Sequence, residues 1–165
     1  MGYFIRNMRV GDWDSVAEIY RQGIESGTAT FRRDLPDFVS WDRAHLNICR
    51  LVVCDSDETV VGWAALSPTS NRIDYKGVCE ISIYIDEKHK GKGLGKALMR
   101  EIIDEAERNE IWTLQSVIFQ VNKASIKLHE KCGFRVVGYR EKIARDRYNQ
   151  WQNTILMEFR SKKIF

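Results

Sequence analysis

A glycine-rich turn between a predicted strand and a predicted helix is the feature that most constrains this chain. It reads Gly91-Lys92-Gly93-Leu94-Gly95-Lys96 and follows the apolar run Ile81–Ile85. Glycine allows positive φ and has no Cβ to keep a ligand from the main chain. Amides at a helix N-terminus point outward together and favour an anion. The turn therefore predicts a phosphate site rather than a helix start with incidental glycines, and four lysines add positive charge: Lys88, Lys90, Lys92 and Lys96.

The spacing of the glycines narrows the choice of phosphate ligand. A P-loop requires GxxxxGK[ST], but Lys90 stands at its first glycine and Ala97 at its hydroxyl position. The dinucleotide pattern GxGxxG ends at Lys96 in one frame and at Leu98 in the other. A short loop of this kind suits a pyrophosphate without a bound metal.

Two stretches resemble the signatures of the GNAT N-acetyltransferases. Lys90 to Gly95 overlays the acetyl-CoA pattern [QR]-x-x-G-x-[GA], and Asn122 to Phe134 resembles N-x-x-[AS]-x-x-[LF]-[YH]-E-K-x-G-F. The resemblance covers nearly the whole chain and implies acetyl-CoA as co-substrate, with no metal. The implied cofactor-binding residues are Ile83, Tyr84, Ile85, Lys90, Gly91, Lys92, Gly93, Leu94, Gly95, Lys96 and Asn122.

Within that superfamily the chain is most similar to the phosphinothricin and amino-acid N-acetyltransferase branch. The matching stretches are Ile24 to Phe31, Tyr75 to Asp86 and Trp151 to Glu158. The resemblance implies an α/β fold with a mixed, mostly antiparallel sheet, helices on both faces and two central strands that splay apart. It also suggests a homodimer, by analogy only.

Periodicity predicts the order of the elements. We expect a strand over 3–10, a helix from Asp12 to Ile24, a second helix starting at Pro36, and a hairpin over 51–66. The central strand 78–85 feeds the glycine turn and a long helix from Leu94. A strand over 113–121, a helix from Asn122 to Lys131 and a closing pair of strands over 135–143 and 154–159 complete the sheet. Gly133 suits the C′ position of the last helix.

Size and composition fit one domain over residues 1–165. The net charge is only +3 and the 23 acidic residues are interspersed, so nucleic-acid binding is the weakest of the alternatives. No apolar run approaches the ~20 residues that span a bilayer, and the N-terminus lacks the pattern of a signal peptide. We therefore expect no membrane association and a cytoplasmic location.

The four cysteines predict neither a zinc site nor covalent catalysis. Cys49, Cys54, Cys79 and Cys132 form no CxxC pair and no Cys/His spacing typical of zinc. Cys132 lies at a helix end, where the dipole would not lower a thiol pKa.

Amide formation from a thioester requires a positioned amine, a base and stabilisation of the oxyanion. The resemblance implies that Glu80 is the general base, directly or through water, although it could be a solvated glutamate. The main chain of Ile83, Tyr84 and Ile85 would pair with pantetheine, and its last amide would polarise the acetyl carbonyl. Asn122 would contact the cofactor arm or simply cap a helix.

His129 departs from the tyrosine that many GNAT enzymes use to protonate the leaving thiolate. The phosphinothricin branch often has histidine there, so we place His129 among the catalytic candidates, with a structural role as the alternative. The candidate acceptor-binding residues are Phe31, Arg72, Tyr75, Tyr148 and Trp151. Arg72 would hold a carboxylate in its fork. Tyr148 replaces a usual histidine and Asn153 a usual aspartate, which leaves the particular amine open.

The sequence thus predicts acetylation of a small primary amine, most simply an amino acid or an analogue such as phosphinothricin or methionine sulfoximine or sulfone. A second hypothesis is a GNAT enzyme for another amine: a protein N-terminus, a polyamine or an aminoglycoside. A third is a non-catalytic module that binds acyl-CoA.

Overall fold

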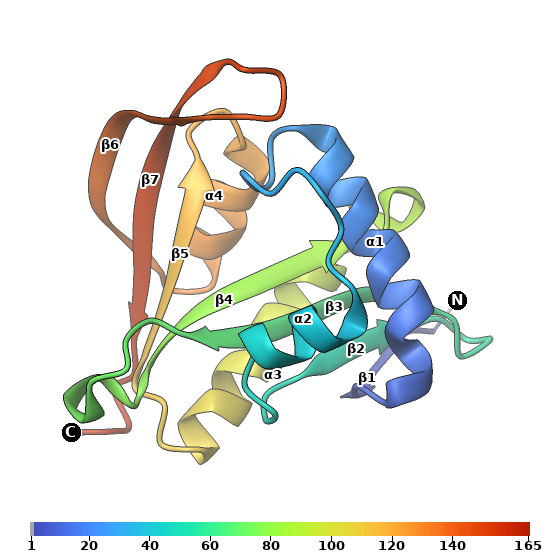
Figure 1. The fold of residues 1–165 in the computed structure, drawn as a ribbon. Coiled ribbons are helices and arrows are strands. Elements are labelled where there is room, and N and C mark those ends of the chain that lie inside the picture. The colour runs from blue at the N-terminus through green and yellow to red at the C-terminus, as the bar shows by residue number, and fades with distance from the viewer. Residues whose placement is uncertain (1) are drawn as a thin grey trace.

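A computed structural model describes residues 2–165, which form a seven-stranded mixed sheet with helices on both faces (Figure 1). The strands are β1 (Phe4–Asn7), β2 (Leu51–Cys54), β3 (Val60–Pro68), β4 (Val78–Ile85), β5 (Thr113–Phe119), β6 (Arg135–Arg145) and β7 (Trp151–Arg160). The helices are α1 (Trp13–Ser26), α2 (Phe38–Ala44), α3 (Leu94–Arg108) and α4 (Lys123–Lys131), with short 3-10 turns η1 (Val10–Asp12), η2 (Ile73–Tyr75) and η3 (Glu87–His89).

The strand order is β1-β2-β3-β4-β5-β7-β6. Every neighbouring pair is antiparallel except β4 and β5, which are parallel because the whole of α3 connects them. The order of strands and helices along the chain confirms the one predicted from periodicity.

The apolar residues form two cores, one on each face of the sheet. Leu98 and Ile102 recur at helical spacing on α3 and are fully buried against one face. Val16 of α1 and Trp41 of α2 are buried against the other face, next to Trp63 of β3. Figure 1 accordingly shows α1 and α2 in front of the sheet and α3 behind it.

The first strand is shorter than predicted, because Asp12 bends the chain before α1. Its carboxylate accepts hydrogen bonds from Arg6 Nη1 at 2.7 Å and from the Arg9 amide at 2.6 Å. The chain therefore leaves the sheet after Asn7 and winds into η1. Asp12 does precede α1, as predicted, but its side chain makes no capping bond to that helix.

The second helix starts two residues later than predicted. Its N-cap is Asp37, so Pro36 lies before the helix rather than in its first turn. It ends at Ala44, because the Leu46 amide donates to the Leu66 carbonyl of β3 at 2.8 Å and draws the chain toward the sheet.

The predicted C′ glycine of α4 is confirmed, since Gly133 follows the C-cap with a φ of 91°.

The two parallel strands separate soon after they begin to pair. Their register runs from Val78↔Thr113 to Glu80↔Gln115 and stops there. Each strand stays paired on its outer side, β4 with β3 as far as Ile85 and β5 with β7 as far as Phe119. Figure 1 shows β4 and β5 diverging from this common start, which confirms the predicted splay.

No helix within residues 2–165 is long and apolar enough to cross a membrane. The same residues contain no group of three or more His, Cys, Asp or Glu side chains arranged to hold a metal ion.

Leu98→Ala should lower the free energy of unfolding by about 3 kcal/mol, because it leaves a cavity where α3 meets the sheet. Urea denaturation followed by circular dichroism measures the change. Val10→Ala, at a side chain that is 78% exposed, is the control and should cost about 0.5 kcal/mol or less. Equal losses in the two variants would contradict this assignment of the core.

Candidate active site

A cavity of about 590 Å³ lies between β4 and β5, beyond the point where the two strands separate. Its walls come from α1, the segment 28–31, β4, the turn before α3, β5 and the start of α4. It is large enough for part of a cofactor and a small substrate, and it lies at a break in the sheet, a common place for ligands.

The glycine turn forms one end of this cavity. Gly91 and Gly93 have φ values of 76° and 79°, which side chains rarely adopt, and Gly93 is the N-cap of α3. A Cβ built on either residue meets no atom within 4 Å, so the space in front of the turn is open. The first amides of α3 have no acceptor within the helix and are available to an anion. The residues therefore fit the predicted diphosphate group.

The predicted lysines lie at different places around the turn. Lys90 lines the cavity, whereas Lys88 is exposed outside it. Lys92 Nζ donates a hydrogen bond to the Tyr3 hydroxyl at 3.2 Å, and Lys96 also lies outside the cavity wall. Of these four lysines, Lys90 is the one that lines the cavity.

Gly95 serves packing rather than backbone conformation. A Cβ at this position would lie 3.2 Å from Leu128 Cδ2, so the glycine lets α3 approach α4 closely. Leu94 is buried and lines the cavity next to it.

The main chain of β4 forms the side of the cavity. Ile83, Tyr84 and Ile85 pair with β3 on one edge, and their other edge faces the space that β5 has left. Backbone N–H and C=O groups of a strand that has no neighbour on that edge can form strong hydrogen bonds with a ligand. The Tyr84 ring itself packs in the core between Tyr20 and Trp63, with both ring centroids 5.0 Å away.

Glu80 is the last residue of β4 that pairs with β5, and its side chain lines the cavity. Residues alternate along a strand, so Glu80, Ser82 and Tyr84 face α1. Burial raises the pKa of the Glu80 carboxyl above its ordinary value of 4.5. A carboxylate with a raised pKa accepts a proton more readily, which suits the predicted role as base.

His129 is 1% exposed and lines the cavity from α4. Its Nδ1 lies 2.7 Å from the Ser125 carbonyl oxygen, which can only accept, so Nδ1 carries the hydrogen. Burial lowers the pKa of the imidazole, which is therefore neutral at pH 7. Nε2 then carries a lone pair, and within residues 2–165 it has no hydrogen-bond partner. In this state His129 can accept a proton but cannot donate one from Nε2.

Asn122 both caps α4 and lines the cavity. Its Oδ1 accepts a hydrogen bond from the Ser125 amide at 3.2 Å, and its Nδ2 donates to the Thr28 carbonyl at 3.3 Å. The predicted cap is therefore confirmed. The second bond ties α4 to the segment after α1, which forms the opposite wall.

The structure brings one of the five predicted acceptor-binding residues to the cavity. Phe31 lines the wall and packs on Phe119 at 4.3 Å between ring centroids. Arg72 and Tyr75 lie on the exposed turn before β4, with the Arg72 guanidinium 5.7 Å from the Tyr75 ring centroid.

Tyr148 and Trp151 belong to the β6–β7 hairpin and lie outside the cavity wall. The Tyr148 hydroxyl donates to the Glu25 carbonyl at 3.1 Å, and its ring covers Gly27. Trp151 is stacked by the Arg145 guanidinium, 4.6 Å from the ring centroid.

The sequence reasoning missed several polar residues of the cavity wall: Gln22, Ser26, Thr28, Thr30, Ser82, His89 and Ser116. Ser82 could have been found, because strand alternation places it on the same face as Glu80. The others come from separate segments, and only the tertiary structure brings them together.

Known proteins resemble this chain in sequence and in fold. The family model described as Acetyltransferase (GNAT) family matches residues 13–134. The L-methionine sulfoximine/L-methionine sulfone acetyltransferase of Pseudomonas aeruginosa is 27% identical over 163 residues, covering 96% of this chain and 94% of that protein. The phosphinothricin N-acetyltransferase of Alcaligenes faecalis is 26% identical over 160 residues, covering 93% and 80% respectively.

A crystal structure shares the whole fold. It is that of a GNAT superfamily phosphinothricin acetyltransferase from Sinorhizobium meliloti in complex with AcCoA. The TM-score is 0.90 at 27% sequence identity, and the match covers 99% of this chain and 91% of that chain.

Gly93→Val should weaken coenzyme A binding roughly tenfold or more, since a β-branched residue at this φ costs about 1–3 kcal/mol of strain. Calorimetry with coenzyme A measures the dissociation constant. Gly11→Val is the matched control, because its Cβ also meets open space while its φ is ordinary. Unchanged affinity in Gly93→Val would show that the turn does not bind the ligand.

Proposed function

The chain belongs to the acetyltransferase (GNAT) family and is an N-acetyltransferase with acetyl-CoA as co-substrate, and we propose that it acetylates the primary amine of an amino acid or a close analogue. Phosphinothricin and methionine sulfoximine or sulfone are the analogues that the names of its relatives suggest. We propose that residues 1–165 act as one domain. The observation that supports this proposal most is the cavity itself, with an anion-binding turn at one end and a half-buried carboxylate in its wall.

The glycine turn and Lys90 would hold the diphosphate of acetyl-CoA, with Lys92 and Lys96 adding positive charge nearby. The free edge of Ile83, Tyr84 and Ile85 would pair with the pantetheine arm, which Asn122 would contact from α4. This placement runs the arm along β4 toward Glu80, because the turn and Glu80 lie at opposite ends of that strand.

In the proposed reaction, Glu80 accepts a proton from the ammonium of the acceptor, directly or through water. The neutral amine attacks the thioester carbonyl, and a main-chain amide of the Ile83–Ile85 stretch stabilises the oxyanion. The intermediate collapses with cleavage of the C–S bond as the nitrogen loses its second proton. The products are the neutral amide and the thiolate of coenzyme A, which takes up that proton directly or by way of His129. His129 lies beside the sulfur in this proposal, and it can protonate the thiolate only after it has gained a proton itself.

For the acceptor, Phe31 supplies an apolar wall. Arg72 and Tyr75 precede β4, at the end of the strand where Glu80 stands. The exposed Arg72 guanidinium would exchange its 3.5 Å contact with Asp74 for the carboxylate of an acceptor. Tyr148 holds the end of α1, and Trp151 lies on the same hairpin. We propose that both residues shape the acceptor side of the site.

A cationic acceptor such as a polyamine or an aminoglycoside is the second candidate. Within residues 2–165, Glu80 is the sole carboxylate of the cavity wall and no arginine lines it. A screen of amines that detects thiol release and identifies products by mass spectrometry separates the two candidates. Thiol release with amino acids but not with polyamines supports the first, and the reverse supports the second. Binding of coenzyme A without release for any amine would indicate a non-catalytic module.

We further propose that the enzyme works as a homodimer in the cytoplasm. A reducing compartment suits its free cysteines. The edge strand β6 and the start of β7 expose four large apolar side chains by about half: Val136, Tyr139, Ile143 and Trp151. An exposed apolar edge strand is a common contact surface between copies.

Glu80→Gln should lower kcat about 100-fold, the lower end of the contribution of a general base, with little change in coenzyme A affinity. In the unmodified enzyme, activity should fall as the pH drops through the raised pKa of Glu80, because the protonated carboxyl cannot accept the amine proton. Stopped assays across pH give both quantities. A low-pH limb that survives in Glu80→Gln would assign the base to another group.

Sedimentation equilibrium should give the mass of two chains, and Ile143→Asp should shift it toward one chain, because a charge on the contact surface opposes association. Val10→Asp, which is exposed away from β6, should leave the mass unchanged. A single-chain mass for the unmodified protein would contradict the dimer.

A further inference from the structure

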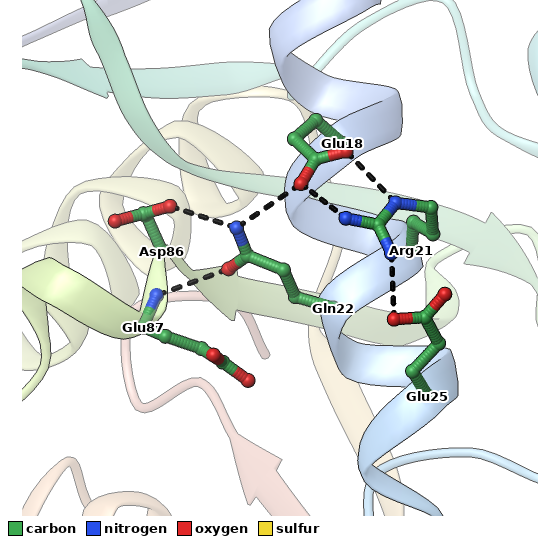
Figure 2. Close-up of polar contacts among 6 residues, drawn as sticks. All are labelled: Glu18, Arg21, Gln22, Glu25, Asp86 and Glu87. Atoms are coloured by element: carbon green, nitrogen blue, oxygen red, sulfur yellow. Dashed lines mark hydrogen bonds and ion pairs between the residues drawn. The ribbon is translucent and has the colours of Figure 1, made fainter.

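Gln22 of α1 holds the segment that leads into the glycine turn. Its Nε2 donates to Asp86 Oδ2 at 2.9 Å, and its Oε1 accepts from the Glu87 amide at 3.0 Å. Figure 2 shows both bonds crossing from α1 to the end of β4. The two partners are 64 and 65 residues away in sequence, so one amide side chain joins two distant segments.

Asp86 is the hub of this segment. Its amide donates to the Val61 carbonyl at 2.9 Å, which fixes it to β3. Its Oδ1 accepts from the Lys88 amide at 3.0 Å and from His89 Nδ1 at 2.8 Å. Asp86 Oδ2 accepts the hydrogen bond from Gln22, so one carboxylate oxygen binds α1 and the other binds the residues that follow Asp86.

Gly23 has no side chain, and this lets α1 lie close enough to β4 for Gln22 to reach Asp86 and Glu87. A Cβ on Gly23 would lie 2.5 Å from the Tyr84 ring, so only glycine lets the helix rest on that ring. Tyr84 lies two residues before Asp86, and Gln22 is next to Gly23. The close approach therefore places the Gln22 amide beside the end of β4.

The surrounding charges favour an amide over a carboxylate at position 22. Nε2 lies between Asp86 Oδ2 and Glu18 Oε1, which is 3.5 Å away, and it has one hydrogen for each. Glu18 is itself paired with Arg21 at 2.5 Å (Figure 2). A glutamate at position 22 would add a third carboxylate where donors are needed.

We propose that Gln22 is a positioning residue for acetyl-CoA, which fixes the diphosphate-binding turn from α1 without touching the diphosphate. This inference rests on the proposed placement of the diphosphate at Gly91 and Gly93. The turn is rich in glycine and carries no bulky packing of its own at these two residues. The segment that leads into the turn is held by bonds made from outside, and Gln22 makes two of them, to Asp86 and to Glu87.

The expected loss of coenzyme A affinity depends on how many molecules keep the turn in its binding conformation. Affinity falls in proportion to the fraction of molecules in which the turn has its binding conformation. Loss of one hydrogen bond of ordinary strength shifts such an equilibrium about fivefold. Gln22→Ala removes two such bonds and should therefore raise the dissociation constant of coenzyme A about 25-fold.

The test is a double-mutant cycle measured by calorimetry with coenzyme A and by steady-state kinetics. Gln22→Glu sets a carboxylate against Asp86 and should weaken binding at least as much as Gln22→Ala. Combining it with Asp86→Asn exchanges the two groups. The new asparagine then donates to the new glutamate, while its oxygen still accepts from the Lys88 amide and His89. The double variant should recover most of the affinity.

Asp14→Asn is the control on the same helix, since Asp14 is exposed and its side chain makes no hydrogen bond or ion pair within residues 2–165, so affinity should be unchanged. The KM for acetyl-CoA should rise in the single Gln22 variants, while kcat and the KM for the amine change less than twofold.

Three outcomes would overturn the inference: unchanged coenzyme A affinity in Gln22→Ala, a change confined to the amine KM, or no recovery in the double variant. Gly93→Val in parallel separates this result from the proposed binding site. If Gly93→Val weakens binding and Gln22→Ala does not, the site stands and the role of Gln22 is wrong.

Discussion

The separation of two parallel strands in the middle of the sheet is the constraint on which the site depends. A buried strand edge must find partners for its amides and carbonyls, so a gap between β4 and β5 is costly if nothing fills it. The cost is limited because β3 and β7 still pair with the outer edges as far as Ile85 and Phe119. The result is a cavity whose wall is partly main chain, which can recognise a pantetheine amide by strand-like hydrogen bonds.

The charges around this cavity make its two ends different, one positive and one negative. One end carries outward-pointing amides, the positive end of α3 and Lys90, and the β4 wall at the other end carries Glu80. A ligand with a diphosphate at one end and a thioester at the other can bind in one orientation only. The orientation brings the thioester toward the half-buried carboxylate, where an ammonium group would also be attracted. In the proposed arrangement, one strand, β4, positions both substrates.

The sequence predicted most of the fold and the cofactor end, because both depend on local signals. Alternation on 78–85, glycine spacing at 91–95 and the Asn122 cap each specify structure within a few residues. The start of α2 was misplaced, because the Asp37 side chain caps the helix by accepting from the Ser40 amide. The end of β1 was misplaced, because the Asp12 carboxylate bonds to Arg6 and to the Arg9 amide. Among the predicted acceptor residues only Phe31 lines the cavity. Such a wall is assembled from α1, β5 and a loop, and no local pattern specifies it.

The freedom of the glycine turn explains why it needs support from another element. Positive φ at Gly91 and Gly93 aims the amides, but the same residues lose more conformational entropy than any others when they become ordered. Bonds from outside the turn offset that loss before the ligand arrives. Gln22 supplies two such bonds from α1 to the segment that enters the turn, and residues 28–31, which follow α1, line the cavity on the proposed acceptor side. Helix α1 therefore borders both proposed binding sites, and a shift of this helix would alter the two together.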